Sequence, residues 1–258
     1  MPPHILITAA VNQEIENLLQ ITEKLNIVHI GGRKTYQGSI EKRKVRILVT
    51  GPGSVNTVQA MTACIENSKP ILIIQTGCAG AFQESGLQTG DIGIATEEID
   101  IHLGIESEKP HTPPAELPFS VLKKGGTALK NRYPCSKSLP DLACKILVDA
   151  LTKEKINVKK GPFVTVSTIT ATDKSARSLY RQFSATMEVM EGAGAAHLSI
   201  HYNIPFLEIR SASNLVGKRE KDKWDLDLAC RNSNKAVFAF IRSFEPSMLD
   251  SFINRQLD

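Results

Sequence analysis

The 258-residue sequence contains no long apolar run, and this absence excludes one class of protein. No stretch approaches the roughly 18 consecutive apolar residues that a membrane-spanning helix needs. Residues 1–4 carry no cationic leader, so we expect that the protein is not secreted. The sequence therefore predicts a cytoplasmic protein with no membrane partner.

Cysteine and net charge are also low. The five cysteines are scattered, odd in number and without Cys-x-x-Cys spacing, which excludes a disulfide framework and a zinc knuckle and favours a reducing compartment. A net charge of +4 is too small to indicate a nucleic-acid-binding protein. The densest charge cluster, residues 218–223, alternates in sign as solvated loops do. We expect no nucleic acid partner.

Two partial motifs lack the residues that would complete them. His197 and His201 are four apart, a spacing found in zinc sites, but Leu198 replaces the glutamate of His-Glu-x-x-His and no third ligand is evident. The glycine-containing stretch 51–56 lacks the third glycine and the strand-end acid of a dinucleotide fingerprint. The sequence therefore indicates neither a metal nor a cofactor.

Short apolar runs alternate with segments of helical spacing along the chain. The runs lie at residues 5–8, 45–50, 70–75, 91–96, 163–168, 186–190 and 205–210, and several are continuous, as in strands covered on both faces. Helical spacing lies around residues 15–25, 55–65, 139–150 and 237–244. This alternation predicts one three-layer α/β domain over residues 1–258, with a central mixed, twisted sheet flanked by helices.

Residues 104–139 interrupt this pattern. The segment contains five prolines and the pair Gly125-Gly126. A connection of this length in a compact domain is usually functional or disordered. We expect it to form a substrate lid or a contact between subunits.

The most informative residues follow two late strands. Met190-Glu191 stands where an apolar segment changes to small residues that predict a helix. A carboxylate in such surroundings needs a ligand or backbone amides, and it can accept two hydrogen bonds from vicinal ribose hydroxyls. The neighbouring methionine can supply apolar contact with a sugar. The strand at 205–210 is followed by Ser213-Asn214, a second group of polar residues at a strand end.

Two earlier segments could face the same pocket. Glu14 follows the first strand, where a glutamate is either a first-turn residue favoured by the helix dipole or a general base for water. Cys78, Ala79 and Gly80 are predicted to form a small-residue turn after the strand at 70–75, allowing backbone N–H groups to approach a ligand. Ligands of open α/β sheets bind beyond the carboxyl ends of the strands. Cys78 lacks the spacing of a nucleophile elbow, which argues against a reactive thiol.

These segments together resemble a family of purine-nucleoside-cleaving enzymes, which comprises nucleoside phosphorylases, methylthioadenosine/S-adenosylhomocysteine nucleosidases and futalosine hydrolases. The resemblance implies their α/β fold and a homo-oligomer, most simply a homodimer. It implies that Glu14 is the general base and that Glu191 holds the ribose hydroxyls. It assigns Glu14 and Asn214 to catalysis, and it assigns substrate contacts to Cys78, Ala79, Gly80, Met190, Glu191 and Ser213.

Asn214 bears on the identity of the base. In the methylthioadenosine/S-adenosylhomocysteine nucleosidases this position is an aspartate that protonates adenine N7. A 6-oxopurine instead presents acceptors at N7 and O6, which suit the N–H groups of a carboxamide, and an unmatched buried polar pair costs roughly 1–3 kcal/mol. Asn214 therefore favours hypoxanthine over adenine. With residues 163–170 and Trp224, it gives the chain most resemblance to futalosine hydrolases, the nucleosidases of an alternative menaquinone route.

The resemblance predicts hydrolysis rather than phosphorolysis, because residues 77–82 contain no basic side chain for a phosphate. Three alternatives stay open: another purine nucleosidase, a 6-oxopurine nucleoside phosphorylase to which Arg33, Lys34 or Arg43 supplies the phosphate contacts, and a nucleoside-binding module without catalysis.

Overall fold

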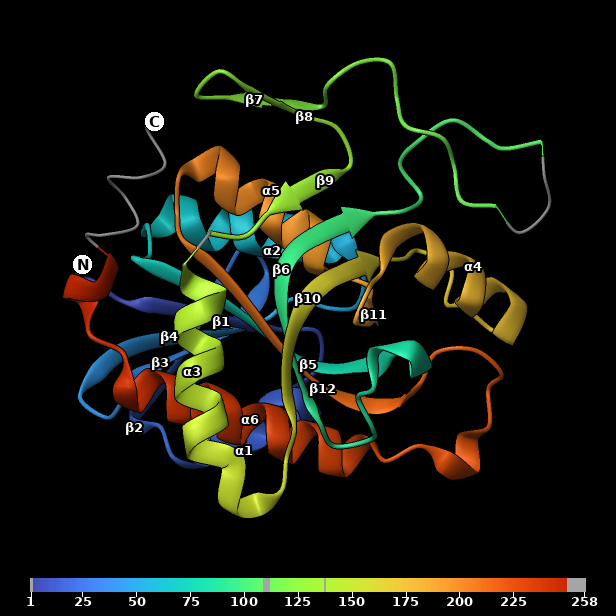
Figure 1. Ribbon diagram of the computed structural model, residues 1–258. Helices are drawn as coiled ribbons and strands as arrows, with labels where there is room; N and C mark the ends of the chain where they lie inside the picture. The colour runs from blue at the N-terminus through green and yellow to red at the C-terminus, as the bar shows by residue number, and fades with distance from the viewer. Residues whose placement is uncertain (1, 109–111, 137, 250–258) are drawn as a thin grey trace.

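The computed structural model describes residues 2–108, 112–136 and 138–249 (Figure 1). The strands of the main sheet are β1 (Ile5–Ala9), β2 (Glu23–Ile30), β3 (Arg33–Ile40), β4 (Arg43–Val49), β5 (Leu72–Ala81), β6 (Ile92–Asp100), β9 (Arg132–Pro134), β10 (Val158–Thr165), β11 (Met187–Val189) and β12 (Phe206–Leu215). A separate hairpin consists of β7 (Leu122–Lys124) and β8 (Thr127–Leu129). The α-helices are α1 (Glu16–Gln20), α2 (Ser54–Asn67), α3 (Leu139–Leu151), α4 (Asp173–Phe183), α5 (Gly192–Tyr202) and α6 (Leu226–Ser243).

The main sheet is mixed and partly closed on itself. Its strand order is β11-β10-β6-β12-β5-β1-β4-β3-β2, with β9 on β6. Strand β11 pairs with β10 in parallel and with β5 in antiparallel orientation, so β5, β12, β6, β10 and β11 form a ring. The other end of the sheet is the antiparallel meander β2-β3-β4.

Helices cover both faces of the sheet (Figure 1). Helices α2 and α5 pack together on one face, and α3 and α6 pack together on the other. Successive residues of β5 point to opposite faces, so Ile73 belongs to the core beneath α2 and α5, whereas Ile74 belongs to the core beside α3 and α6. The predicted three-layer α/β fold with a central mixed sheet is confirmed.

Capping residues define two of the helix starts. Thr172 accepts a hydrogen bond from Ser175 N at the start of α4, and Asp225 accepts one from Leu228 N at the start of α6. Each capping side chain accepts a hydrogen bond from a backbone N–H that has no partner within its helix. Within the described residues, no helix is long and apolar enough to cross a membrane.

The predicted helix at residues 15–25 is wrong in its second half. Helix α1 ends at Gln20, and β2 begins at Glu23. Residues 26–30 pair with β3 through a turn at Gly31-Gly32, where both glycines have positive φ angles that favour this residue type. Cross-strand pairing outweighs the helical spacing of Leu25, which is exposed in the strand.

The turn predicted at Cys78–Gly80 is also wrong. These residues continue β5, which pairs with β12 as far as Ala81. A long β5 is stabilised because a second neighbour, β11, pairs with its last residues. Small side chains here let three strands lie close together beside a cavity, rather than forming a turn.

The segment 104–139 is less irregular than predicted, because it contains the β7–β8 hairpin and β9. Residues 109–111 and 137 lie outside the described residues. Its described residues do not line the cavity that contains the candidate site residues, so they form no lid over it within this chain. A subunit contact through this segment, and the homodimer itself, stay predictions.

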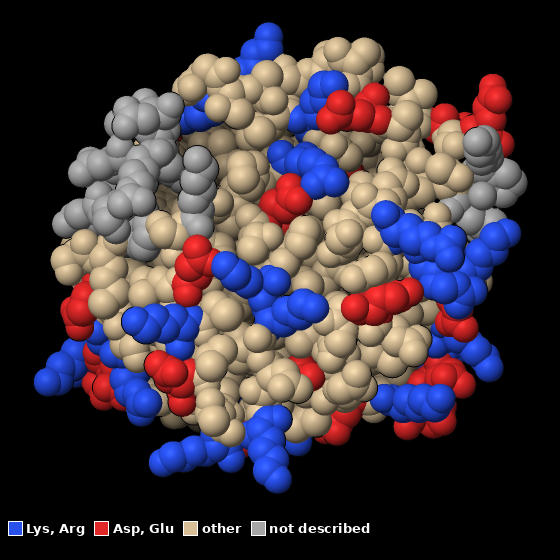
Figure 2. Space-filling view, in the orientation of Figure 1, with Lys and Arg blue, Asp and Glu red and all other residues tan. Residues whose placement is uncertain are grey.

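Most of the face shown in Figure 2 consists of uncharged residues, with acidic and basic side chains scattered over it and a group of basic side chains at the right. This basic group does not extend across the face, because uncharged residues separate it from the other basic side chains.

Candidate active site

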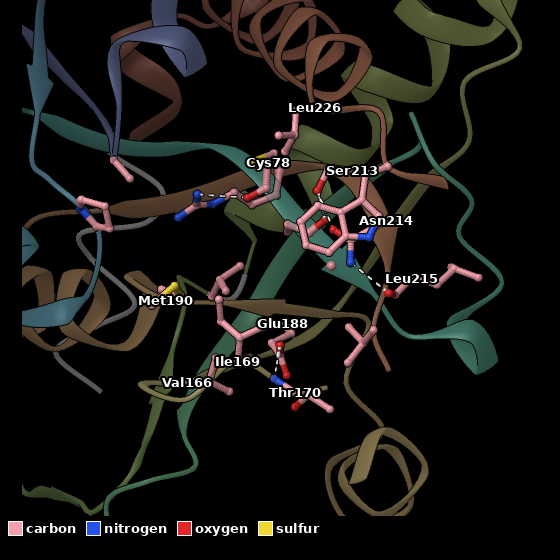
Figure 3. Close-up of a pocket in the computed structure, with 18 of the residues that line it drawn as sticks. Cys78, Val166, Ile169, Thr170, Glu188, Met190, Ser213, Asn214, Leu215 and Leu226 are labelled. Carbon is pink, nitrogen blue, oxygen red and sulfur yellow. Dashed lines mark hydrogen bonds between the residues drawn. The ribbon is translucent and has the colours of Figure 1, made fainter. Parts of the chain in front are cut away.

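A cavity of about 280 Å³ lies where β1, β10 and β11 end and beside the last residues of β5 and β12 (Figure 3). This is the edge of the sheet where α/β proteins bind ligands. All eight candidate residues from the sequence line it: Glu14, Cys78, Ala79, Gly80, Met190, Glu191, Ser213 and Asn214. Segments up to 200 residues apart in the chain thus contribute to one cavity.

Glu14 is held by backbone amides. It lies in the short 3₁₀ helix η1 (Asn12–Ile15) after β1, and it is buried. Its Oε2 accepts hydrogen bonds from Ala10 N at 2.8 Å and Val11 N at 3.2 Å, and its Oε1 accepts one from Cys78 N at 3.0 Å. Both oxygens are therefore fixed in position at the cavity wall, and the Cys78 thiol also lies 3.4 Å from Oε1.

Gly77 allows this approach of Glu14 to β5. Its φ of 137° lies outside the range of most residues, and a Cβ there would collide with Glu14 Oε1 and with the guanidinium of Arg210. A side chain at position 77 would separate the carboxylate from the strand.

Glu191 is held from two sides. Its Oε1 accepts a hydrogen bond from Gly53 N at 2.8 Å, and its Oε2 accepts one from Arg210 Nη2 at 3.0 Å. The glycine turn before α2 therefore acts as an amide donor to this carboxylate, which explains the Gly-Pro-Gly stretch without a dinucleotide. The buried Glu191 lies at the start of α5.

Arg210 connects the carboxylates beneath the cavity. Its side chain is 1% exposed, its Nε donates to Glu208 Oε1 at 2.8 Å, and its Nη1 lies 3.8 Å from Glu14 Oε1. Burial alone would lower the pKa of the guanidinium, but the carboxylates of Glu208, Glu191 and Glu14 raise it. The arginine thus keeps its charge and positions Glu14 and Glu191.

Two further carboxyl groups meet behind Arg210. Glu98 of β6 and Glu208 of β12 are fully buried, and a Cβ on Gly192 would collide with an oxygen of each. Thr165 Oγ1 donates to Glu98 Oε2 at 3.0 Å and accepts from Ala193 N at 2.8 Å. Burial, followed by the charge of Glu208, raises the pKa of Glu98 well above its usual range, whereas Arg210 and a hydrogen bond with Glu98 oppose the rise that burial causes in the pKa of Glu208.

The charges around the cavity floor do not cancel. Glu14, Glu191 and Glu208 surround the single guanidinium of Arg210. Two of these carboxylates line the cavity, so its floor presents an excess of negative charge to a ligand. Such a floor stabilises positive charge that develops on a bound molecule and repels an anion.

Ser213 fixes the orientation of Asn214. The Ser213 hydroxyl donates to Asn214 Oδ1 at 2.8 Å and lies 3.2 Å from Ala79 O, and Asn214 Nδ2 donates to Leu215 O at 2.9 Å (Figure 3). The amide oxygen is therefore an acceptor for Ser213, and one of the two N–H groups is already used. Asn214 offers a ligand one N–H group rather than the two expected from the sequence.

Cys78 has no features of a nucleophile. A hydrogen bond with Cys230, followed by burial and the charge of Glu14, raises the pKa of its thiol well above the usual value. A protonated thiol is a poor nucleophile. Within the described residues, no group of three or more His, Cys, Asp or Glu side chains could hold a metal ion.

Sequence reasoning gave no role to Arg210, Glu98, Glu208 or Glu188. Arg210, Glu208 and Glu188 are charged residues inside predicted apolar strands. A charged residue in such a strand indicates that the side chain is buried and paired. Glu188 lies in the predicted strand at 186–190, but the interpretation of that strand's end was based on Met190-Glu191 alone. The loop residues Lys218, Arg219 and Trp224 also line the cavity.

Comparison with known proteins identifies the family. The model of the phosphorylase superfamily matches residues 4–242. The 5'-methylthioadenosine/S-adenosylhomocysteine nucleosidase of Haemophilus ducreyi is 27% identical over 247 residues, which cover 92% of this chain and 97% of the relative. That of Desulfotalea psychrophila is also 27% identical, over 94% of this chain and 98% of the relative.

Solved structures share the fold. The 5'-methylthioadenosine/S-adenosylhomocysteine nucleosidase of Neisseria meningitidis, in complex with methylthio-immucillin-A, superimposes with a TM-score of 0.78 at 23% identity, covering 93% of this chain and 99% of that one. The futalosine hydrolase of Helicobacter pylori gives a TM-score of 0.78 at 20% identity, covering 94% of this chain and 98% of that one. The family expected from the sequence is confirmed: this chain belongs to the phosphorylase superfamily.

Proposed function

We propose that this protein hydrolyses the N-glycosidic bond of a 6-oxopurine nucleoside, and specifically of futalosine, releasing hypoxanthine. Its family placement makes it an enzyme that cleaves purine nucleosides at this bond. The observation that carries the proposal is the pair of carboxylates, Glu14 and Glu191, fixed around the buried Arg210 in a cavity whose other residues include Asn214.

The carboxylates suit the sugar. In this proposal Glu191 accepts hydrogen bonds from the ribose hydroxyls, and Met190 lies against the ring. Glu14 takes a proton from water as that water attacks the anomeric carbon. As the bond to the base breaks, positive charge develops on the sugar, and the negative cavity floor stabilises it.

The same charges favour water over phosphate as the attacking group. The three carboxylates around Arg210 already engage its guanidinium, so it is a poor site for a phosphate. Arg33, Lys34 and Arg43, which the sequence left as potential phosphate ligands, do not line the cavity, whose basic lining residues besides Arg210 are Lys218 and Arg219. Arg33 instead donates to Asn56 and Gln59, and Arg43 donates to Phe244 O and Glu245.

Base release from a substrate panel tests the proposal directly. We expect hypoxanthine release from futalosine at a rate that is independent of phosphate, with lower kcat/KM for inosine and for methylthioadenosine. The free sugar is the expected co-product. Phosphate-dependent turnover that yields a sugar 1-phosphate would establish phosphorolysis instead. Nucleoside binding without base release would establish a binding module.

Asn214→Asp is expected to shift base preference from hypoxanthine toward adenine. In the variant, a carboxyl group replaces the N–H donor, so the 6-oxopurine loses a partner worth roughly 1–3 kcal/mol, which corresponds to about 5–150-fold in the ratio of kcat/KM values. Futalosine and its 6-amino analogue give the ratio. Asn131→Asp, which changes an amide outside this cavity, is the control and should leave the ratio unchanged. An unaltered ratio in Asn214→Asp would place base recognition elsewhere.

A further inference from the structure

Glu98 and Glu208 are buried carboxyl groups that the proposed mechanism does not use. Both side chains are 0% exposed, and they lie on the neighbouring strands β6 and β12. A Cβ on Gly192 would lie 2.2 Å from Glu98 Oε2 and 2.6 Å from Glu208 Oε2, so the two groups share one small space. Two buried carboxyl groups this close together are not both ionised, because the like charges repel and no solvent screens them.

Each of the two groups has one oxygen with a partner and one without. Thr165 Oγ1 donates to Glu98 Oε2 at 3.0 Å, and Arg210 Nε donates to Glu208 Oε1 at 2.8 Å. The other two oxygens, Glu98 Oε1 and Glu208 Oε2, are buried and have no hydrogen-bond partner in the described structure. An ionised carboxyl group only accepts hydrogen bonds, so two ionised groups cannot pair with each other. One proton between the two remaining oxygens gives a partner to both.

This proton also closes a ring of contacts around the site. The ring consists of Arg210, Glu208, Glu98, Thr165, Ala193 and Glu191. Ala193 N donates to Thr165 Oγ1 at 2.8 Å, and Ala193 lies in the first turn of α5. Two residues earlier, Glu191 accepts from Arg210 Nη2 at 3.0 Å, which returns the ring to its start. The guanidinium at that point also lies 3.8 Å from Glu14.

The charges near the pair do not replace the proton. In the part of the chain that the structure describes, the groups that act on the pair are Arg210 of β12, Glu191 at the start of α5, and Cys135 after β9. Arg210 already compensates Glu14 and Glu191. Burial, followed by the charges of the pair, raises the pKa of the Cys135 thiol well above its usual value, so the thiol stays neutral.

We propose that Glu98 and Glu208 hold one proton between Glu98 Oε1 and Glu208 Oε2, and that this proton keeps Arg210 where it orients Glu14 and Glu191. Glu98 and Glu208 are then positioning residues, which act on the substrate only through Arg210 and α5. Loss of the proton adds a second negative charge on one side of Arg210 and draws the guanidinium away from Glu14 and Glu191. The positioning role rests on the proposed function, whereas the shared proton does not.

The number of protons taken up on folding tests the shared proton without turnover. At neutral pH both groups are ionised in the unfolded chain, so folding takes up one proton at this pair. The wild-type free energy of unfolding should therefore fall as pH rises from about 6 to about 8, with a slope that includes this proton. In Glu98→Gln an amide N–H replaces the shared proton, so the slope should be smaller by about one proton. Denaturant unfolding at several pH values gives both slopes.

Glu97→Gln is the matched control for Glu98→Gln. Glu97 is the adjacent residue of β6, its side chain is 25% exposed, and it pairs with Arg132 at 2.7 Å. This variant should keep the wild-type slope. Infrared spectra of the wild type at neutral pH provide a measurement that needs no variant, because a protonated carboxyl group has a C=O band distinct from that of a carboxylate. The lack of such a band would exclude the shared proton.

Activity tests the positioning role. Glu98→Met keeps most of the volume but removes the donor to Glu208, so kcat for base release should fall at least about tenfold, as for loss of one hydrogen bond to a charged group. Glu98→Gln retains a donor, so its kcat at neutral pH should stay within about threefold of the wild type. The wild-type kcat should also fall at alkaline pH as the pair loses its proton, and Glu98→Gln should lack this titration.

The outcomes separate the two proposals. Equal slopes in Glu98→Gln and the wild type would show that the pair holds no extra proton, and the inference is then wrong. A slope difference of one proton, with wild-type kcat in a folded Glu98→Met, would refute the positioning role. If the wild type releases no hypoxanthine from futalosine, the proposed function fails, and the slopes still decide whether the proton is present.

Discussion

Replacing Glu14 by glutamine is expected to lower kcat by about 10²–10⁴-fold, the usual contribution of a general base. An amide cannot take a proton from water, whereas the other substrate contacts stay in place. KM should therefore change much less than kcat. Single-turnover measurement of base release separates the chemical step from product dissociation.

The structure indicates that this substitution also lowers the stability of the folded protein. Both Glu14 oxygens accept backbone N–H groups, from Ala10 and Val11 on one side and from Cys78 on the other. Glutamine has one acceptor oxygen, so one of these sides must face an N–H donor. Loss of stability of about 1–3 kcal/mol is expected from such an unpaired group, and the melting temperature must be measured beside the rate.

Glu16→Gln is the matched control for Glu14→Gln, because Glu16 is the first residue of α1, close to Glu14 in the chain, and is exposed. It should retain wild-type kcat and melting temperature. Full activity in Glu14→Gln would remove the water-activation role and leave Glu14 as a structural residue. A loss of activity that follows only the loss of folded protein would lead to the same conclusion.

The sequence predicted the layers of the fold but not all of the pairings between its strands. Continuous apolar strands such as 70–75 and amphipathic helices such as 139–150 follow from local patterns that burial on the sheet preserves. The turn predicted at Cys78–Gly80 failed because a strand rich in small residues is stabilised by partners distant in the chain. Register with β11 and β12 is not visible in the local sequence.

The candidate site was predictable in its residues and less so in their connections. Glu14, Glu191 and Asn214 were found because each polar residue stands at the end of an apolar strand. The other charged residues, Arg210, Glu208 and Glu98, lie inside strands. Their contacts therefore depend on which strands are neighbours in the sheet. Only the fold shows that β6 and β12 bring Glu98 beside Glu208, and that Arg210 reaches both Glu14 and Glu191.

Arg210→Met is expected to destabilise the protein by about 3–5 kcal/mol, the cost of removing one partner from a buried ion pair. The substitution keeps most of the side-chain volume but removes the charge that compensates Glu14, Glu191 and Glu208. A protein of this size should lose about 6–20 °C in melting temperature. Denaturant unfolding, followed by far-UV circular dichroism, gives the midpoint and the slope together.

Arg132→Met provides the contrast, because Arg132 lies 2.7 Å from Glu97, closer than Arg210 lies to Glu191, but its side chain is 45% exposed. Water compensates the remaining charge there, so the expected loss is about 0–1 kcal/mol. A second substitution tests the cause in the buried cluster. Adding Glu208→Gln to Arg210→Met removes one uncompensated carboxylate and should restore part of the lost stability. If Arg132→Met and Arg210→Met cost the same, or if Glu208→Gln makes Arg210→Met worse, the buried carboxylates are not compensated by Arg210, and its role in positioning Glu14 and Glu191 fails with that result.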